Sequence, residues 1–199
     1  RRPDRPMAKR IRGILFDLGD TILDFGKMDV DALFHEGARA TYEYLKGRGH
    51  RLPSFRWYAL RQWLSVRWHY VLSHLSGREF DSLQLVSRLG RGLGYRMSRE
   101  EALEVTWRWY LPMRRVATVE DGLKDALAAL RKEGLKIGLV SNTFVPGELL
   151  DRHLQEEGLL DFFPLRVYSS DAGHRKPCRQ IFRLALKRIG LGAWETAFV

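Results

Sequence analysis

The chain has 199 residues, of which 45% are hydrophobic and 29% charged, and its formal net charge at pH 7 is +10. This composition is typical of a globular protein with a hydrophobic core, and it excludes a low-complexity or collagen-like chain. No apolar run approaches the ~20 residues that cross a bilayer, so we expect no membrane partner and a cytoplasmic location. The single cysteine, Cys178, excludes an internal disulfide and a metal site built from several cysteines.

The basic charge balance by itself fits a nucleic acid, a membrane surface or an acidic small molecule. Many of the 34 Lys and Arg residues are spread through the helices predicted below, and no zinc-finger, basic-zipper or RNA-recognition pattern accompanies them. We therefore interpret them as solvated helix faces and do not expect nucleic acid as the partner. The sequence leaves the oligomeric state open.

Residues 12–17 form an apolar run that predicts a buried strand ending at Asp17. Two amphipathic helices are predicted next, one with apolar residues at helical spacing from Val30 and one that Ser54 can cap. We expect the long apolar stripe of the second helix to pack into a small helical core. The stripe consists of Trp57, Leu60, Leu64, Trp68, Val71, Leu72 and Leu75.

A third helix is predicted before the glycine-rich sequence LGRGLG, and a fourth opens with a capping box from Ser98 to Glu101. The fourth helix is expected to stop at Pro112, because proline lacks the backbone N–H that a helix interior needs. These helices predict an inserted helical subdomain over residues 27–113. Five of the six tryptophans fall inside it, and we expect them to pack its core.

Beyond Pro112 the pattern changes to an alternation of helices and strands. Helices are predicted at 119–133, 146–157 and 178–189, and strands at 137–140, 165–169 and in the final Ala-Phe-Val. Such alternation favours a parallel sheet, to which the first strand also belongs. We therefore predict an α/β fold with a doubly wound, Rossmann-like parallel-sheet core, formed by residues 8–26 and 114–199 and interrupted by the helical cap.

Three predicted strands are each followed by a polar group that can take part in catalysis or binding. Asp17 ends the first, Ser141 with Asn142 ends the second, and Lys176 lies in the loop after the third. Each alone is more often a turn or helix-cap residue. In a doubly wound sheet, however, functional groups gather at the carboxyl ends of the strands. A carboxylate nucleophile, hydrogen-bond donors and a fixed cation together suit attack on a phosphoryl group or a similar electrophile.

These residues resemble the motifs of the haloacid dehalogenase superfamily of phosphatases and dehalogenases. Its first motif, an apolar strand ending in a nucleophilic Asp, is similar to "ILFDLGDT" with Asp17, and its second, a strand ending in Ser or Thr, is similar to Ser141. A helical cap inserted after the first motif is typical of the phosphoglycolate phosphatase and haloacid dehalogenase subgroup. The third motif is matched by Gly173, Lys176, Pro177, Ile181 and Phe182.

The resemblance implies a Mg²⁺-dependent phosphatase that acts on a small phosphorylated metabolite. Asp17 would attack phosphorus to form an aspartyl-phosphate, and Lys176 would neutralise the transferring oxygens. Ser141 would donate a hydrogen bond to the phosphoryl group. Asp17 and the backbone carbonyl of Gly19 would bind the metal. The predicted substrate-binding residues are Asn142, Thr21 and Gly19.

Two departures from the family pattern qualify this prediction. Phosphatases of the family usually carry a second Asp, the general acid, at the position of Gly19. Asp20 is either a substitute acid or only a turn cap. The family's fourth motif, an acidic pair that completes the metal site, is not found, and we expect it beyond Val199.

Two alternatives remain open at this stage. One is a 2-haloacid dehalogenase, which uses the same Asp nucleophile without a metal and for which Arg39 is a candidate ligand of the substrate carboxylate. The other is a catalytically weak or inactive relative that binds RNA or a protein through the basic cap. The sequence does not rank sugar phosphates, nucleotides and phosphoglycolate as substrates.

Overall fold

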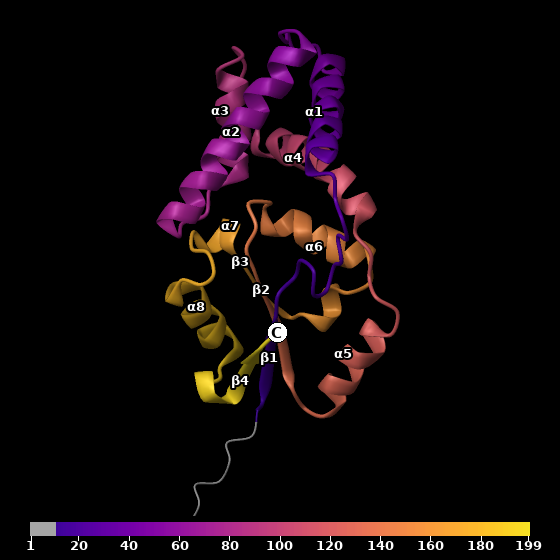
Figure 1. Ribbon diagram of the computed structural model, residues 1–199, viewed down its shortest axis with the longest axis vertical. Coiled ribbons are helices and arrows are strands. Elements are labelled where there is room, and N and C mark those ends of the chain that lie inside the picture. The colour runs from indigo at the N-terminus through magenta and orange to yellow at the C-terminus, as the bar shows by residue number, and fades with distance from the viewer. Residues whose placement is uncertain (1–10) are drawn as a thin grey trace, which may run out of the picture.

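A sheet of four parallel strands, in the order β3-β2-β1-β4, forms the lower lobe of the computed structural model, which describes residues 11–199 (Figure 1). Residues 8–10, with which the predicted core begins, lie outside the described residues. In the centre of the sheet, Ile14 lies opposite Ile137 on one side and Ala197 on the other. The strands are β1 (Gly13–Phe16), β2 (Lys136–Ser141), β3 (Leu165–Tyr168) and β4 (Thr196–Phe198).

Helices cover both faces of this sheet. Leu15, Val140 and Val167 of neighbouring strands pack against α8 (Arg179–Ile189) on one face. On the other face, Ile137 and Leu139 pack with side chains of α5 (Leu123–Lys132) and α6 (Gly147–Glu156). This arrangement confirms the predicted doubly wound α/β fold. The shorter helical segments are η1 (Leu160–Phe162), α7 (Ser169–Ala172) and η2 (Ala193–Glu195).

The upper lobe in Figure 1 is a block of helices inserted between β1 and β2. Its own core is small and centres on Leu45, Tyr58 and Val105. No helix in the described part of the chain is long and apolar enough to span a bilayer. The block, which we call the cap, contains α1 (Val30–Gly47), α2 (Phe55–Ser76), α3 (Ser82–Arg91) and α4 (Arg99–Val116).

The prediction that the fourth helix stops at Pro112 was wrong. Helix α4 continues to Val116 with Pro112 inside it, and the proline is buried. A proline inside a helix removes one backbone hydrogen bond, so the packing of this helix between the cap and the core outweighs a cost of about 3 kcal/mol.

The helix predicted from residue 119 begins later, at Leu123, after Gly122 in a left-handed conformation (φ 82°). The chain just before this segment is paired with the first crossing. Thr118 N–H donates to Asp24 O (2.8 Å) and Asp24 N–H donates to Thr118 O (2.9 Å). This antiparallel bridge joins the two points at which the chain crosses between core and cap. It fixes the crossings side by side.

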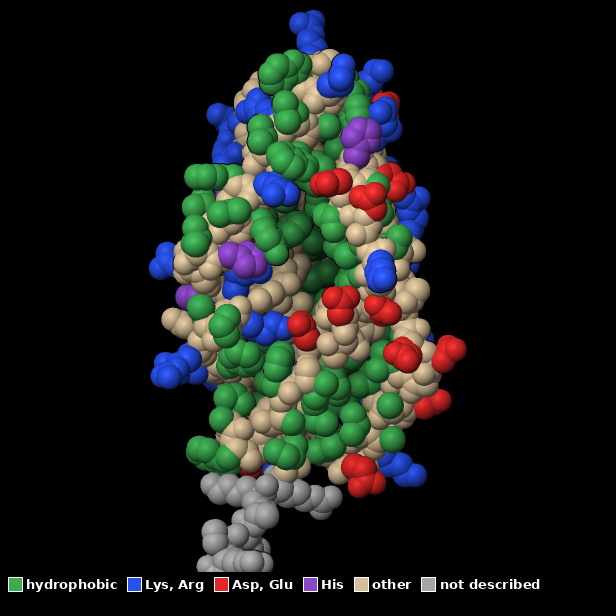
Figure 2. Space-filling model, in the orientation of Figure 1, with side chains coloured by type: hydrophobic (Ala, Val, Ile, Leu, Met, Phe, Trp, Pro, Cys, Tyr) green, Lys and Arg blue, Asp and Glu red, His purple; other side chains and the backbone are tan. Residues whose placement is uncertain are grey.

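The apolar stripe of α2 faces away from the cap core, contrary to the prediction. Trp57 is 68% exposed, Trp68 63% and Leu75 80%, whereas Tyr58 on the opposite side is 4% exposed. Figure 2 shows hydrophobic side chains on the surface of the cap. The expectation that the cap tryptophans are core residues is therefore wrong for Trp57 and Trp68, although Trp107 is buried.

Candidate active site

Asp17 follows β1 directly and faces the lysine of a distant loop. Its Oδ1 accepts a hydrogen bond from Leu18 N–H (2.7 Å), and its Oδ2 lies 2.6 Å from Nζ of Lys176. The carboxylate is about one-third exposed (35%) and the ammonium less so (12%), so the pair opens to solvent on the carboxylate side. Topology explains the meeting, because both residues follow parallel strands at the carboxyl edge of the sheet.

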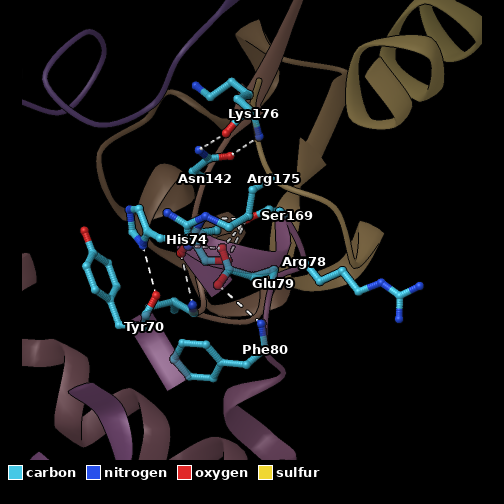
Figure 3. A network of polar contacts seen from close by, with 12 residues as sticks. Tyr70, His74, Arg78, Glu79, Phe80, Asn142, Ser169, Arg175 and Lys176 are labelled. Carbon is cyan, nitrogen blue, oxygen red and sulfur yellow. Dashed lines mark hydrogen bonds and ion pairs between the residues drawn. The ribbon is translucent and has the colours of Figure 1, made fainter. Parts of the chain in front are cut away.

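Asn142 holds the loop that carries Lys176. Its side-chain amide donates to Lys176 O (3.1 Å), and its Oδ1 accepts from Lys176 N–H (2.6 Å), as Figure 3 shows. Both polar groups of the Asn142 amide are used in this two-point contact. The predicted substrate-binding residue thus lies against the lysine backbone, where it sets the position of the ammonium. The Lys176 ammonium also lies 5.0 Å from the ring centre of Phe198.

Ser141 ends β2 and is 4% exposed. It lies opposite Tyr168 in the parallel register of β2 and β3, one residue before Asn142. The loop after it is held by α7, because the N–H of Thr143 donates to Oγ of Ser169 (2.7 Å). The second strand therefore delivers Ser141 to the same edge of the sheet as Asp17, on a loop with fixed geometry.

A buried ion pair that sequence reasoning missed connects the cap to this edge. Glu79, in the loop between α2 and α3, has a fully buried side chain, and its Oε2 accepts from Arg175 (2.7 Å) and from the Ser169 hydroxyl (2.8 Å). The backbone adds a bond from Arg175 N–H to Gly77 O (3.0 Å). Figure 3 shows this network beside Asn142 and Lys176.

No local signal marks Glu79, whereas Arg175 stands beside the lysine of the third motif and is the more recognisable member. Desolvation offsets much of the attraction in a buried charge pair, but one charged member left alone in the interior is costly. We therefore interpret this network of Glu79, Arg175 and Ser169 as the contact that fixes the cap relative to the loop that carries Lys176.

Asp20, Thr21 and Gly19 lie in the turn after Asp17. Asp20 has a left-handed backbone (φ 55°), and its Oδ1 accepts a hydrogen bond from Phe25 N–H (3.4 Å). Its own N–H donates to Leu23 O (2.8 Å). Asp20 and Thr21 are both exposed. These contacts of Asp20 are those of a turn residue.

The oxygen donors of the site fit a hard cation. Among residues 11–199 there is no cluster of three or more His, Cys, Asp or Glu side chains that could hold a metal by itself. The Asp17 carboxylate and the Gly19 carbonyl are the oxygen groups here that could hold a metal. Mg²⁺ is commonly bound through one or two carboxylates, with water and substrate phosphate completing its shell. The donor set therefore suits Mg²⁺ together with a phosphorylated substrate, and it does not suit a thiolate-bound metal.

The comparison with known families agrees with this geometry. A family model described as haloacid dehalogenase-like hydrolase matches residues 11–199. The chain belongs to this family of hydrolases. It is an enzyme family, and the match includes the strand ends that carry Asp17, Ser141 and Lys176.

Individual relatives include both phosphatases and dehalogenases. The chain is 28% identical to a phosphoglycolate phosphatase of Yersinia pseudotuberculosis over 205 residues, which cover 96% of this chain and 73% of that protein. Among solved structures, a haloacid dehalogenase family phosphatase from Thermococcus onnurineus has a TM-score of 0.54 at 23% identity, covering 94% of this chain and 76% of that one. A 2-haloacid dehalogenase from Pseudomonas syringae has a TM-score of 0.57 at 19% identity, with the same coverage. These structural likenesses show the fold.

Proposed function

We propose that this hydrolase cleaves a small phosphate monoester through an aspartyl-phosphate intermediate on Asp17. The observation that carries the proposal is the 2.6 Å contact between Asp17 and the Lys176 ammonium at the edge of the sheet. An Asp17 oxygen forms a bond to phosphorus while the bond from phosphorus to the leaving oxygen breaks. Water then attacks the phosphorus, releases inorganic phosphate and restores the carboxylate.

The surrounding groups have complementary roles in this proposal. The Lys176 ammonium offsets the negative charge that the two anionic reactants bring together. Asn142 keeps that ammonium in place through its two bonds to the lysine backbone. Ser141 is a donor to the phosphoryl oxygens. Mg²⁺, when bound by Asp17 and the Gly19 carbonyl, supplies further positive charge against the same repulsion.

The leaving oxygen needs a proton when it departs as an alkoxide, and position 19 carries no acid for this purpose. A missing general acid typically costs about 10²–10⁴-fold in rate, and less for good leaving groups. We propose that acyl and aryl phosphates react faster than alkyl phosphates, with Asp20 as the nearest candidate for a substitute acid.

The test is phosphate release from p-nitrophenyl phosphate in the presence of Mg²⁺, measured for the wild type, Asp17→Asn and Asp20→Asn. Asp17→Asn should abolish turnover, because an amide is not a nucleophile here. Asp20→Asn is the matched control in the same turn, and it should leave turnover of this substrate nearly unchanged, because p-nitrophenolate departs without a proton. An unchanged rate in Asp17→Asn would refute the assigned nucleophile.

A second candidate function, hydrolytic dehalogenation, is favoured by one observation: the Asp17–Lys176 pair stands beside Gly19, without a second carboxylate there. In that reaction Asp17 displaces halide from carbon to form an ester, which water cleaves to a hydroxy acid. Arg39, the candidate ligand of the substrate carboxylate in a dehalogenase, lies in the cap with its guanidinium 4.0 Å from the ring centre of Phe55.

Halide release from 2-chloropropionate, assayed beside phosphate release, separates the two functions directly. Halide without phosphate supports dehalogenation. Retention of RNA without either product supports the non-catalytic alternative.

A further inference from the structure

The cap contains a cavity of about 470 Å³ that lies between α1, α2 and α4 and the loop after β2. Its walls are mainly aliphatic and aromatic, and include Leu33, Phe34, Trp63, Trp109 and Phe144. The volume is large enough for a ring-sized organic group. A cavity of this kind is the usual form of a small-molecule site.

Two walls of the cavity lie beside residues that neighbour the candidate active site in the sequence. Phe144 comes two residues after Asn142, on the loop that follows β2. Tyr70 forms another wall, and its ring centre lies 5.7 Å from the guanidinium carbon of Arg175, which directly precedes Lys176. Figure 2 shows the hollow between cap and core, with hydrophobic side chains deep inside it and charged side chains at its lower rim.

The charged residues that line the cavity are held by Trp63. The Trp63 indole N–H donates to Asp31 (3.5 Å), and the Arg67 guanidinium lies 4.8 Å from a Trp63 ring centre. The rest of the lining is almost wholly apolar, with the Tyr70 hydroxyl as the other polar group. A sugar or nucleoside would therefore lose water from several hydroxyls and find only Asp31, Arg67 and Tyr70 as partners, which is unfavourable.

We propose that this cavity receives the carbon skeleton of the substrate and selects a phosphate ester of an apolar, ring-sized alcohol or phenol over a sugar phosphate. The proposal rests on the proposed phosphatase function, since the phosphate would occupy the Asp17–Lys176 site. The apolar group would then extend past Phe144 into the cap.

The test compares cyclohexylmethyl phosphate with glucose 6-phosphate. Both carry the phosphate on a primary alcohol next to a six-membered ring, so they differ mainly in hydroxyl groups. We expect kcat/KM to be at least about tenfold higher for the cyclohexylmethyl ester. Equal values, or a preference for the sugar, overturn the proposal.

A pair of variants on α2 locates the effect. Val71 lines the cavity and is 49% exposed, so Val71→Glu places a charge at its edge without burying it fully. Leu75 lies one turn further on, is 80% exposed and does not line the cavity. Val71→Glu should remove most of the preference for the apolar ester, and Leu75→Glu should keep it. Equal effects of the two variants contradict the assignment.

Binding separates this inference from the proposed reaction. Cyclohexylmethyl phosphonate has a P–C bond that is not hydrolysed, and its binding can be followed by calorimetry and by tryptophan fluorescence, to which Trp63 and Trp109 of the cavity wall contribute. We expect binding to the wild type that Val71→Glu weakens by about tenfold or more and Leu75→Glu does not. Binding of this pattern without turnover keeps the cavity assignment and refutes the reaction. Absence of binding refutes the cavity assignment even where p-nitrophenyl phosphate is hydrolysed.

Discussion

The sheet of the core and helix α2 of the cap both carry regular apolar patterns, yet only the sheet buries its pattern as predicted. Leu139 and Val140 are both 0% exposed, because helices cover the two faces of the sheet. In α2, Leu64 is 53% exposed although its stripe keeps helical spacing. A strand that is apolar on both faces is buried whichever face meets a given helix. An amphipathic pattern identifies the apolar face of a helix but does not show whether that face packs against the cap core or lies at the surface.

Polar contacts decide which side of α2 turns inward. The Tyr58 hydroxyl donates to Thr41 Oγ1 (2.9 Å), and the Gln62 amide donates to the same oxygen (3.4 Å). Thr41 is 0% exposed, so these bonds form inside the cap. Burial raises the pKa of the Tyr58 hydroxyl, which keeps it a neutral donor. A buried polar cluster of this kind gives no periodic signal in the sequence.

The largest expected effect on stability tests the contact between the two regions. Glu79→Ala should lower the free energy of unfolding by about 3–5 kcal/mol, because it leaves the Arg175 guanidinium buried without its carboxylate. Urea unfolding measures the difference. The double variant Glu79→Ala/Arg175→Met should recover part of the loss. If the double variant is no more stable than the single one, the ion pair is not the source of the effect.

A smaller effect on the free energy of unfolding is expected when one leucine of each apolar pattern is replaced by alanine. Leu139→Ala in the sheet should cost about 2–5 kcal/mol, because it opens a cavity in a fully packed core. Leu64→Ala on α2 should change the free energy of unfolding by less than ~0.5 kcal/mol, as is usual for surface substitutions. Similar losses for the two variants, measured by the same urea titration, would show that the α2 stripe is buried in solution.

Acid should weaken the core through His153. Burial, and then the charge of Arg114, lower the pKa of this imidazole to about 4, from an ordinary value of 6.5. The unfolded chain therefore binds a proton more readily, so the contribution of His153 to stability is lost as the pH falls from 6.5 towards 4, by at most about 1.4 kcal/mol per pH unit. Unfolding measured at pH 7 and pH 5 gives the slope. In His153→Gln the slope should be shallower, and an identical slope contradicts this account.

An effect on rate is expected at Asn142, which positions Lys176. Asn142→Ala should lower kcat for p-nitrophenyl phosphate by about tenfold to 100-fold, because a misplaced group near the reacting atoms has a large effect on rate. Asn142→Asp retains the acceptor for the Lys176 N–H but sets a second acceptor against Lys176 O, so it should also lower kcat. If both variants keep the wild-type kcat, Asn142 does not position the ammonium.

The sequence predicted the parallel sheet, the inserted helices and the residues at the strand ends, because each has a local pattern with a physical cause. It did not predict the direction of the α2 stripe or the continuation of α4 through Pro112, since tertiary packing overrides local preference in both. No periodic pattern in the sequence predicts the partners of Glu79 either. Their contacts join side chains from separate loops, and only the folded chain brings these together.

Acid quenching during turnover of p-nitrophenyl phosphate, followed by mass spectrometry of the peptides, tests the covalent role of Asp17. The account predicts one added phosphoryl group on the peptide that contains Asp17, and none on that peptide in Asp17→Asn. A phosphoryl group on another residue during continued turnover would contradict the account. So would the absence of any phosphoryl group at saturating substrate, under conditions in which hydrolysis of the intermediate is slow.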